Sequence, residues 1–351
     1  MHIPDGYLSP STCATFYALS AAGWYTSLRR LKRVFATRTI PMVSVFAAFS
    51  FIVMMFNVPL PGGTTGHALG VTVAAIVLGP AGSIWAVSIA LAIQALLFGD
   101  GGITTLGANC FNMAIVGSLV AYGVYQLVAT GSDVSSRRRV IAAAIAGYTS
   151  INVCALVTAI EFGIQPTFFH DAAGTPLYAP YPLRVAIPAM MIGHLTIAGL
   201  AEALVSAGMV SYLQRADINL LRGLGAAPIP TVSSASNAGA ASARLWWAVG
   251  LLMLGTPLGI LAAGTAWGEW SSRDLSARLQ QQAASAPGKP ANPSTVPVGL
   301  QRLASIWTAP FPSYAPPFVR SPLLGYFLSA MFAVGLLVLI SLLGMAWGRR
   351  A

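Results

Sequence analysis

Charged residues are scarce in this sequence. Only 8% of the 351 residues are Asp, Glu, Lys or Arg, whereas 56% are hydrophobic. Soluble domains carry about 25% charged residues, so the composition predicts a polytopic membrane protein, as does the mean hydropathy of +0.72. The net charge of +10 does not indicate a nucleic acid partner, because the basic residues form short clusters between long uncharged runs.

The sequence also lacks the motifs of several protein classes. Its three cysteines, Cys13, Cys110 and Cys154, lie in apolar segments without a CxxC pair, which predicts buried core residues rather than a disulfide framework or a zinc site. No GxxxxGK[ST] phosphate-binding loop is present, so ATP hydrolysis by such a loop is not expected of this chain. The absence of HExxH and GxSxG motifs argues against an intramembrane protease or hydrolase.

The first basic residues follow the first apolar stretch instead of preceding it. Arg29, Arg30, Lys32 and Arg33 come after the uncharged residues 8–28, whereas a signal peptide carries its positive charge ahead of its apolar region. Because basic segments stay on the cytoplasmic side, we expect an uncleaved amino terminus on the extracytoplasmic side.

Long uncharged runs recur along the chain. Crossing a hydrocarbon layer of about 30 Å takes roughly 20 helical residues, so these runs predict an all-α bundle. The run 68–99 is too long for one span and contains LGPAGS, whose Gly-Pro and Gly residues divide it in two. The first of these two segments is short enough to be tilted, partial or re-entrant. The predicted membrane helices are 8–28, 41–57, 67–79, 82–98, 103–129, 140–163, 184–213, 245–268 and 321–347.

The basic residues also predict the orientation of this bundle. With nine segments and an external amino terminus, thirteen of the 19 Lys and Arg residues lie inside and six outside. This asymmetry follows the positive-inside rule. It places the carboxyl terminus in the cytoplasm of a multi-pass protein in the inner or plasma membrane.

Two segments are rich in small residues and proline. Residues 226–243, AAPIPTVSSASNAGAASA, are typical of a flexible linker, predicted on the cytoplasmic side. Residues 269–320 form a predicted external loop whose middle, QQQAASAPGKPANPST, is expected to be poorly ordered. The predicted organisation is a membrane domain at 1–222, a linker at 223–244 and a two-helix unit at 245–351.

The opening residues, MHIPDGYLSP, bring three nitrogen donors together. They are the Met1 amine, the His2 backbone nitrogen and His2 Nδ1, and binding through them closes a five-membered and a six-membered chelate ring. The backbone nitrogen must lose its proton, which calls for a strongly polarising metal that accepts planar nitrogen coordination. Ni(II) and Cu(II), followed by Co(II), meet this need better than Mg(II) or Ca(II). The Pro4-Asp5-Gly6 turn can fold the terminus back onto the protein.

His67 is the candidate for a fourth ligand. It lies in PLPGGTTGHALG, a glycine-rich segment at the start of a predicted helix on the external side. The same position would also suit a helix cap or a buried polar contact. Of the other histidines, His170 lies in the external FFHDAAGTP loop and is expected to be solvated. His194 lies in an apolar helix, where either packing or function explains it.

Three polar residues inside predicted helices also need partners. Asn109 and Asn112 lie in the external half of a helix, where an amide pairs with another helix or with a group at a binding site. Together with His194, they are candidates for holding the metal ligands in place. Glu202 lies toward the inner half of its helix, where a carboxylate is costly. We expect it to serve the structure or a partner rather than to bind metal.

Four segments resemble the CbiM/NikM family of substrate-binding components of energy-coupling-factor transporters for cobalt and nickel. They are MHIPDGYLSP at the start, GGTTGHALG around His67, FGDGGITTLGANCFNMAIVG at 98–117 and GHLTIAGLAEALVSAG at 193–208. The resemblance covers about residues 1–220 and implies a seven-helix membrane component whose free amino terminus plugs inward. It also implies a metal held by the Met1 amine, the His2 backbone and ring nitrogens, and His67.

The resemblance implies partners as well. A transmembrane coupling protein and separate ATP-binding cassette subunits would supply ATP hydrolysis, so the chain itself would be a transporter subunit and not an enzyme, surrounded by membrane lipid. The tail resembles the CbiN/NikN-type partner, which has two helices around an external loop. The PDGLE sequence of that partner corresponds to VPVGLQ at 296–301, without the Asp and Glu, and its aromatic-proline stretch to WTAPFPSYAPP at 307–317. A role that depends on the acidic pair is therefore not implied.

Nickel is favoured over cobalt as the transported substrate. Low-spin Ni(II) gains most from a square-planar field of four nitrogens, and MHIPDG is closer to the nickel branch than the MHIMEG of cobalt members. The alternatives are a metal-dependent membrane enzyme, such as a copper oxidase, and a metal sensor or passive channel. The enzyme needs an open coordination position, which four protein nitrogens in one plane would fill. Co-purification with ATPase subunits would argue against both alternatives.

Overall fold

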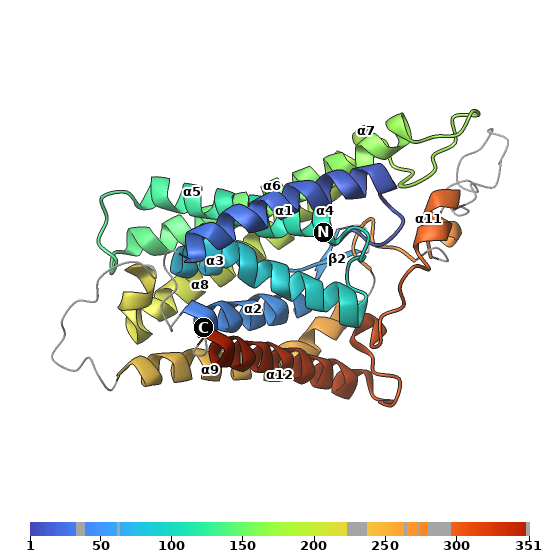
Figure 1. Cartoon of the computed structure of the whole chain (residues 1–351). Coiled ribbons are helices and arrows are strands. Elements are labelled where there is room, and N and C mark those ends of the chain that lie inside the picture. Colours follow the sequence, from blue (N-terminus) through green and yellow to red (C-terminus); the bar gives the residue numbers. More distant parts are fainter. Residues whose placement is uncertain are drawn as a thin grey trace.

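Most of the chain is α-helical, and the long helices run side by side (Figure 1). The computed structural model describes residues 1–32, 39–61, 64–222, 237–262, 265–271, 274–278 and 296–348. The first helices are α1 (Pro10–Lys32), α2 (Thr39–Met55) and α3 (Val71–Ile93), which continues as the π-helix η1 (Gln94–Phe98). They are followed by α4 (Leu106–Asn109), the π-helix η2 (Cys110–Val116), α5 (Gly117–Ala129) and α6 (Arg137–Phe168).

The second half of the chain is helical as well. It continues with α7 (Leu183–Gly193), the π-helix η3 (His194–Ala198), α8 (Gly199–Ala216) and the 3-10 helix η4 (Ile218–Arg222). The last elements are α9 (Asn237–Gly255), the 3-10 helix η5 (Thr256–Leu261), α11 (Val298–Leu303), the 3-10 helix η6 (Pro312–Tyr314) and α12 (Pro322–Gly348).

Five helical stretches of the described residues are long and apolar enough to cross a membrane. They are Val71–Phe98, Leu106–Ala129, Arg137–Phe168, Leu183–Ala216 and Pro322–Leu343. Two shorter apolar helices are Ile40–Met55 and Leu245–Leu261. The prediction of a polytopic membrane protein is confirmed. The stretch 8–28 does form a helix, α1, but α1 is not one of the five, and the total of seven helices plus two stays a prediction.

The predicted break in the run 68–99 occurs inside α3. Gly79 has the non-helical angles φ 71° and ψ 167°, and Pro80, which has no N–H to donate, follows it. α3 therefore consists of the two predicted segments: the Ser83 hydroxyl after the break donates to the Val71 carbonyl before it at 3.3 Å, which a continuous helix would not allow. Its first turn begins at Val71, so the predicted start at residue 67 is wrong: Gly70, at φ 68°, still belongs to the preceding loop. Residues 67–70 are thereby free to form a loop at the functional site.

Small and hydroxyl-bearing residues join the central helices. The Ser150 hydroxyl of α6 donates to the Gly117 carbonyl of α5 at 2.8 Å, and a Cβ at Gly117 would lie 3.1 Å from Cys154 Sγ. The close approach of α5 and α6 therefore depends on Gly117 having no side chain. Lipid provides no hydrophobic drive between helices, so packing and hydrogen bonds of about 0.6 kcal/mol each hold such a bundle. The prediction for the cysteines is confirmed, because Cys13, Cys110 and Cys154 are all buried and free.

The C-terminal helices α9 and α12 pack against α2, along the lower edge of Figure 1. The Tyr326 hydroxyl of α12 donates to the Met55 carbonyl at the end of α2, at 2.9 Å. Residues 223–236, which include most of the predicted linker, lie outside the described residues. Residues 237–243 belong to α9, so the linker prediction is wrong for them, and α9 with η5 ends at Leu261 rather than at the predicted 268.

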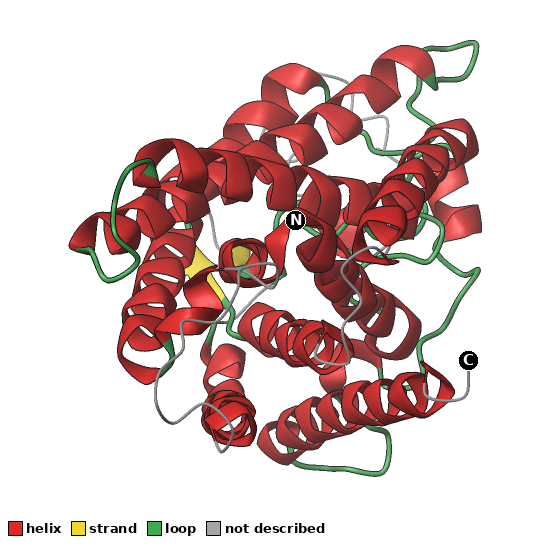
Figure 2. Ribbon diagram, turned by 60° about the vertical axis from the view of Figure 1, so that its left-hand side comes forward, coloured by secondary structure: helices red, strands yellow, loops and turns green. Residues whose placement is uncertain are grey.

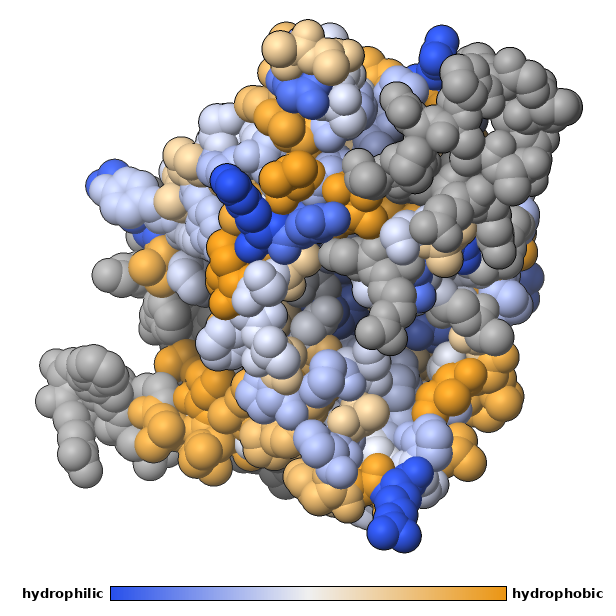
Figure 3. Space-filling model, turned by 90° about the vertical axis from the view of Figure 1, so that its right-hand side faces the viewer, coloured by the Kyte–Doolittle hydropathy of each residue, from blue (hydrophilic) through white to orange (hydrophobic). Residues whose placement is uncertain are grey.

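Loops and a short hairpin close one end of the bundle. Strands β1 (Val58–Leu60) and β2 (Thr64–Gly66) pair antiparallel, with Val58 opposite Gly66, and Figure 2 shows them enclosed by helices. Figure 3 looks onto this end, where hydrophilic and hydrophobic side chains mix. Of the predicted external loop, 279–295 lie outside the described residues, whereas 296–320 contain α11 and η6 and pack on the bundle.

Candidate metal centre

The amino terminus is buried inside the loop end of the bundle. Met1 is 4% exposed, His2 1% and Ile3 0%. The Asn109 side chain binds both backbone groups of Ile3. Its Oδ1 accepts from Ile3 N at 2.8 Å, and its Nδ2 donates to Ile3 O at 3.1 Å. The Ile3 carbonyl also accepts from Gly102 N at 2.9 Å and from the Thr105 hydroxyl at 2.5 Å. The first residues are therefore fixed in register.

The turn that follows directs the terminus inward. Gly6, at φ 89°, allows the backbone to reverse, and Tyr7 N donates to Pro4 O at 3.4 Å. The Asp5 carboxylate accepts from Thr104 N at 2.7 Å and from the Thr104 hydroxyl. The segment after α3 can approach this closely because it is glycine-rich: a Cβ at Gly102 would lie 2.3 Å from Asp5 N.

His67 lies in the loop between β2 and α3. Its Nδ1 is 3.1 Å from the Ala68 carbonyl, a contact in which Nδ1–H donates and Nε2 keeps the lone pair. The loop is anchored by Glu202 of α8, whose Oε2 accepts from Leu69 N at 2.6 Å and from Gly70 N at 3.0 Å. Glu202 is 0% exposed. It thus positions the loop that carries His67, a structural role in this chain.

The rings of His2 and His67 lie close together, and both residues are buried. The ring centroids of His2 and His67 are 5.1 Å apart, with an angle of 62° between the rings. Burial lowers the pKa of His2 from 6.5 to about 4 against the opposing charge of Glu269. Burial, with the neighbouring His2 and the positive amino terminus, lowers the pKa of His67 from 6.5 to about 3. Both rings are therefore neutral near pH 7, the form that binds a metal.

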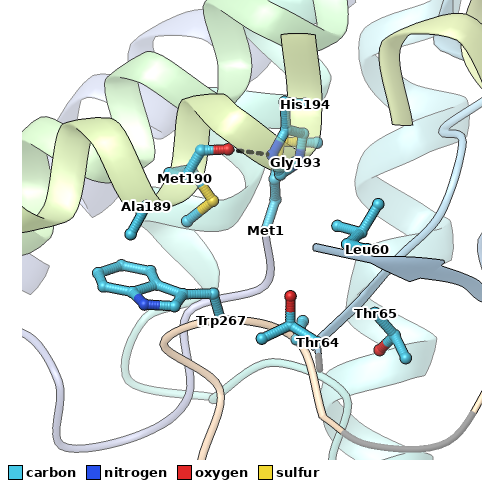
Figure 4. Close-up of a pocket in the computed structure, with 10 residues that line it drawn as sticks. Met1, Leu60, Thr64, Thr65, Ala189, Met190, Gly193, His194 and Trp267 are labelled. Carbon is cyan, nitrogen blue, oxygen red and sulfur yellow. Dashed lines mark hydrogen bonds between the residues drawn. The ribbon is translucent and has the colours of Figure 1, made fainter. Parts of the chain in front are cut away.

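The other residues predicted at the site lie away from the His2 and His67 rings or at the edge of the site. Asn112 points toward α6, where its amide donates to Glu161 at 2.9 Å and to Thr158 at 3.2 Å. His194 has its Nδ1 2.8 Å from the Met190 carbonyl, and it lines a small cavity with Met1, as Figure 4 shows. His170 is exposed, beside the carbonyl of Asp171. Of the residues predicted to hold the metal ligands in place, Asn109 contacts the amino-terminal segment directly.

A family model described as the cobalt uptake substrate-specific transmembrane region, CbiM, matches residues 2–220. The chain belongs to this family. A fused nickel transport protein, NikMN, of Rhodobacter capsulatus is 52% identical over 352 residues, which cover 100% of this chain and 98% of that protein. A probable fused nickel transport protein, LarMN, of Lactiplantibacillus plantarum is 42% identical and covers 80% of this chain and 81% of its own length. The similarity to these fused relatives extends beyond the region that the CbiM model matches.

A solved structure agrees with the CbiM assignment. The crystal structure of a transition metal transporter is 50% identical and superposes with a TM-score of 0.58 over 62% of this chain and 94% of that chain. A cobalt transport protein CbiM of Geobacter sulfurreducens is 31% identical over 64% of this chain and 62% of its own length. The family thus includes relatives named for nickel and relatives named for cobalt.

In this CbiM-family chain, two acidic residues at the candidate metal centre were not predicted from the sequence. Asp100 Oδ1 is 3.4 Å from His2 Nδ1, and Glu269 Oε1 is 2.6 Å from the Met1 amine. Asp100 also accepts from the hydroxyl of Tyr314 at 2.5 Å. The available signal was scarcity: with only 9 Asp and Glu residues in the whole chain, each one on the predicted external side was a candidate.

Proposed function

We propose that this chain captures a divalent transition metal, Ni(II) in preference to Co(II), and delivers it into the cell. It does so as the substrate-binding component of an ATP-driven energy-coupling-factor transporter. The donors are the Met1 amine, the His2 backbone nitrogen, His2 Nδ1 and His67 Nε2. The observation that carries the proposal is the burial of the amino terminus with the His2 ring 5.1 Å from the His67 ring.

The donor set favours nickel for a physical reason. A deprotonated backbone nitrogen between an amine and an imidazole gives a strong planar field, which square-planar Ni(II) uses best among the divalent ions considered. His2 Nδ1 faces Asp100 at 3.4 Å, so loading the metal replaces this contact with a metal–nitrogen bond. The relatives of R. capsulatus and L. plantarum, named as nickel transport proteins, support the same choice.

The proposed orientation has the amino terminus outside the cell and the carboxyl terminus in the cytoplasm. Segments predicted to be external meet at one end of the bundle: the Tyr7 hydroxyl donates to Trp270 O at 2.8 Å, and Leu300 N donates to Leu177 O at 3.3 Å. In Figure 1 the last turns of α12 lie toward the opposite end. Metal thus enters from outside, and separate coupling and ATPase subunits drive its release inward.

Metal content after purification tests the proposal. We would compare the native chain, the chain with one residue added ahead of Met1, His67→Ala and His170→Ala. The extension moves the amine out of chelate register, so it should abolish stoichiometric Ni(II) binding, as should His67→Ala. His170→Ala should keep it, because His170 is exposed and outside the site. Stoichiometric nickel with an unchanged spectrum in the extended protein would refute the proposal.

A further inference from the structure

The C-terminal unit reaches the candidate metal centre through residues 265–271. Ala266 forms a parallel bridge with Thr65 of β2, next to the loop that carries His67. On the other side, the Trp270 carbonyl accepts the Tyr7 hydroxyl at 2.8 Å. Glu269 lies between these two fixed points, and its own N–H donates to Ala266 O at 3.1 Å. The backbone that presents its carboxylate is therefore held in place.

Aromatic side chains enclose this segment. The Trp267 ring lies 4.9 Å from Tyr181, 5.9 Å from Trp270 and 6.1 Å from Phe162 of α6, measured between centroids. Because α6 belongs to the membrane domain, the segment is packed against the domain that carries the metal ligands. In Figure 4, Trp267 and Met1 line the same cavity.

The carboxylate of Glu269 meets the amine that starts the chelate. Its Oε1 is 2.6 Å from the Met1 nitrogen, and the two side chains are 18% and 1% exposed. An amine that binds a metal loses one of its three protons and keeps two N–H bonds. The same carboxylate can therefore accept from the amine before and after the metal binds.

We propose that Glu269 is a positioning residue of the metal centre, supplied by the C-terminal unit. Its carboxylate holds the Met1 amine in chelate register, as an ion-pair partner without metal and as a hydrogen-bond acceptor with it. This inference rests on the proposed function, because it assigns the amine as a ligand. Partners of this kind orient metal ligands and change metal affinity by roughly 10- to 100-fold.

The alternative is that the ion pair only blocks the amine until metal arrives. The two cases differ in sign: a positioning carboxylate strengthens nickel binding, whereas a blocking one weakens it. Removing the carboxylate therefore lowers the affinity in the first case and raises it in the second.

The experiment measures Ni(II) affinity and the visible spectrum at saturating Ni(II), using the full chain in detergent. The variants are Glu269→Ala, Glu269→Asp and the control Asp274→Ala. The control removes another carboxylate of the same unit, one that is exposed and accepts from the Ser271 hydroxyl at 2.6 Å. We expect Glu269→Ala to bind roughly 10- to 100-fold more weakly, Glu269→Asp to recover part of the loss, and Asp274→Ala to match the native chain.

The spectrum separates positioning from direct ligation. Saturated Glu269→Ala should keep the native spectrum, since the four nitrogens remain, whereas His67→Ala should change it. Unchanged or tighter nickel binding in Glu269→Ala would overturn the inference, and so would an altered spectrum at saturation. If His67→Ala loses nickel while Glu269→Ala does not, only this inference fails. If His67→Ala and the extended amino terminus both retain nickel, the proposed function itself fails.

Discussion

Replacing Asn109 with alanine removes the two hydrogen bonds between its side chain and the Ile3 backbone. The Ile3 carbonyl keeps its donors, Gly102 N and the Thr105 hydroxyl, but the N–H of this fully buried residue loses its acceptor. A buried N–H without an acceptor costs about 1–3 kcal/mol. The chelate requires the buried position of the amino terminus. If that position becomes less favourable by this amount, the affinity for Ni(II) drops by roughly 5- to 150-fold.

Asn112→Ala is the matched control for this substitution. Asn112 is equally buried and three residues away, but its amide contacts Glu161 and Thr158 instead of the terminus. We would measure Ni(II) affinity by titration and unfolding temperature for both variants. Asn109→Ala should weaken nickel binding more than Asn112→Ala does at a comparable loss of stability. An equal loss of affinity in the two variants would show that general destabilisation, and not the docking of the terminus, explains the effect.

Three further outcomes are expected. Glu202→Ala leaves two N–H groups without an acceptor and should lower both the unfolding temperature and nickel affinity, whereas Glu202→Gln, whose amide oxygen still accepts, should keep most of both. Tyr314→Phe removes the closer of two side-chain donors to Asp100 beside His2 and should weaken nickel binding by less than roughly tenfold, while Tyr326→Phe in the same unit should not. Because the pKa values of His2 and His67 are lowered to about 4 and about 3, these two residues take up protons just below pH 6.5 only in the unfolded chain. They therefore destabilise the metal-free protein as the pH falls from 6.5 toward 4. This contribution is smaller in His67→Asn, so lowering the pH should cost the variant less unfolding temperature than the native chain; equal changes would contradict the assignment.

The helical segments could be predicted, and chelating residues proposed, because their signals are local. Uncharged runs identify membrane segments wherever they occur in the chain, and Met1 and His2 are adjacent, so their nitrogens need no fold to come together. His67 stood out because the chain has only 4 histidines. These are properties that a sequence displays directly.

The supporting contacts could not be predicted, because they depend on distant segments. Glu269 lies 268 positions from the amine it contacts, and no pattern in the sequence joins the two. Asn109 and Asn112 illustrate a second reason. Three residues apart on an α-helix they would share a face, but the π-helix η2 begins at Cys110 between them. Its wider turn changes the phase, so Asn109 faces the terminus and Asn112 faces α6.

X-ray absorption spectroscopy at the nickel edge of the native, nickel-loaded chain tests the central claim most directly, since it reports the ligand atoms and their geometry. A terminal amine, a backbone nitrogen and two imidazoles predict a four-coordinate, planar site made of nitrogen alone, with two imidazole rings visible in the outer scattering. A six-coordinate site, or one bound through carboxylate oxygens such as those of Asp100 and Glu269, would contradict it.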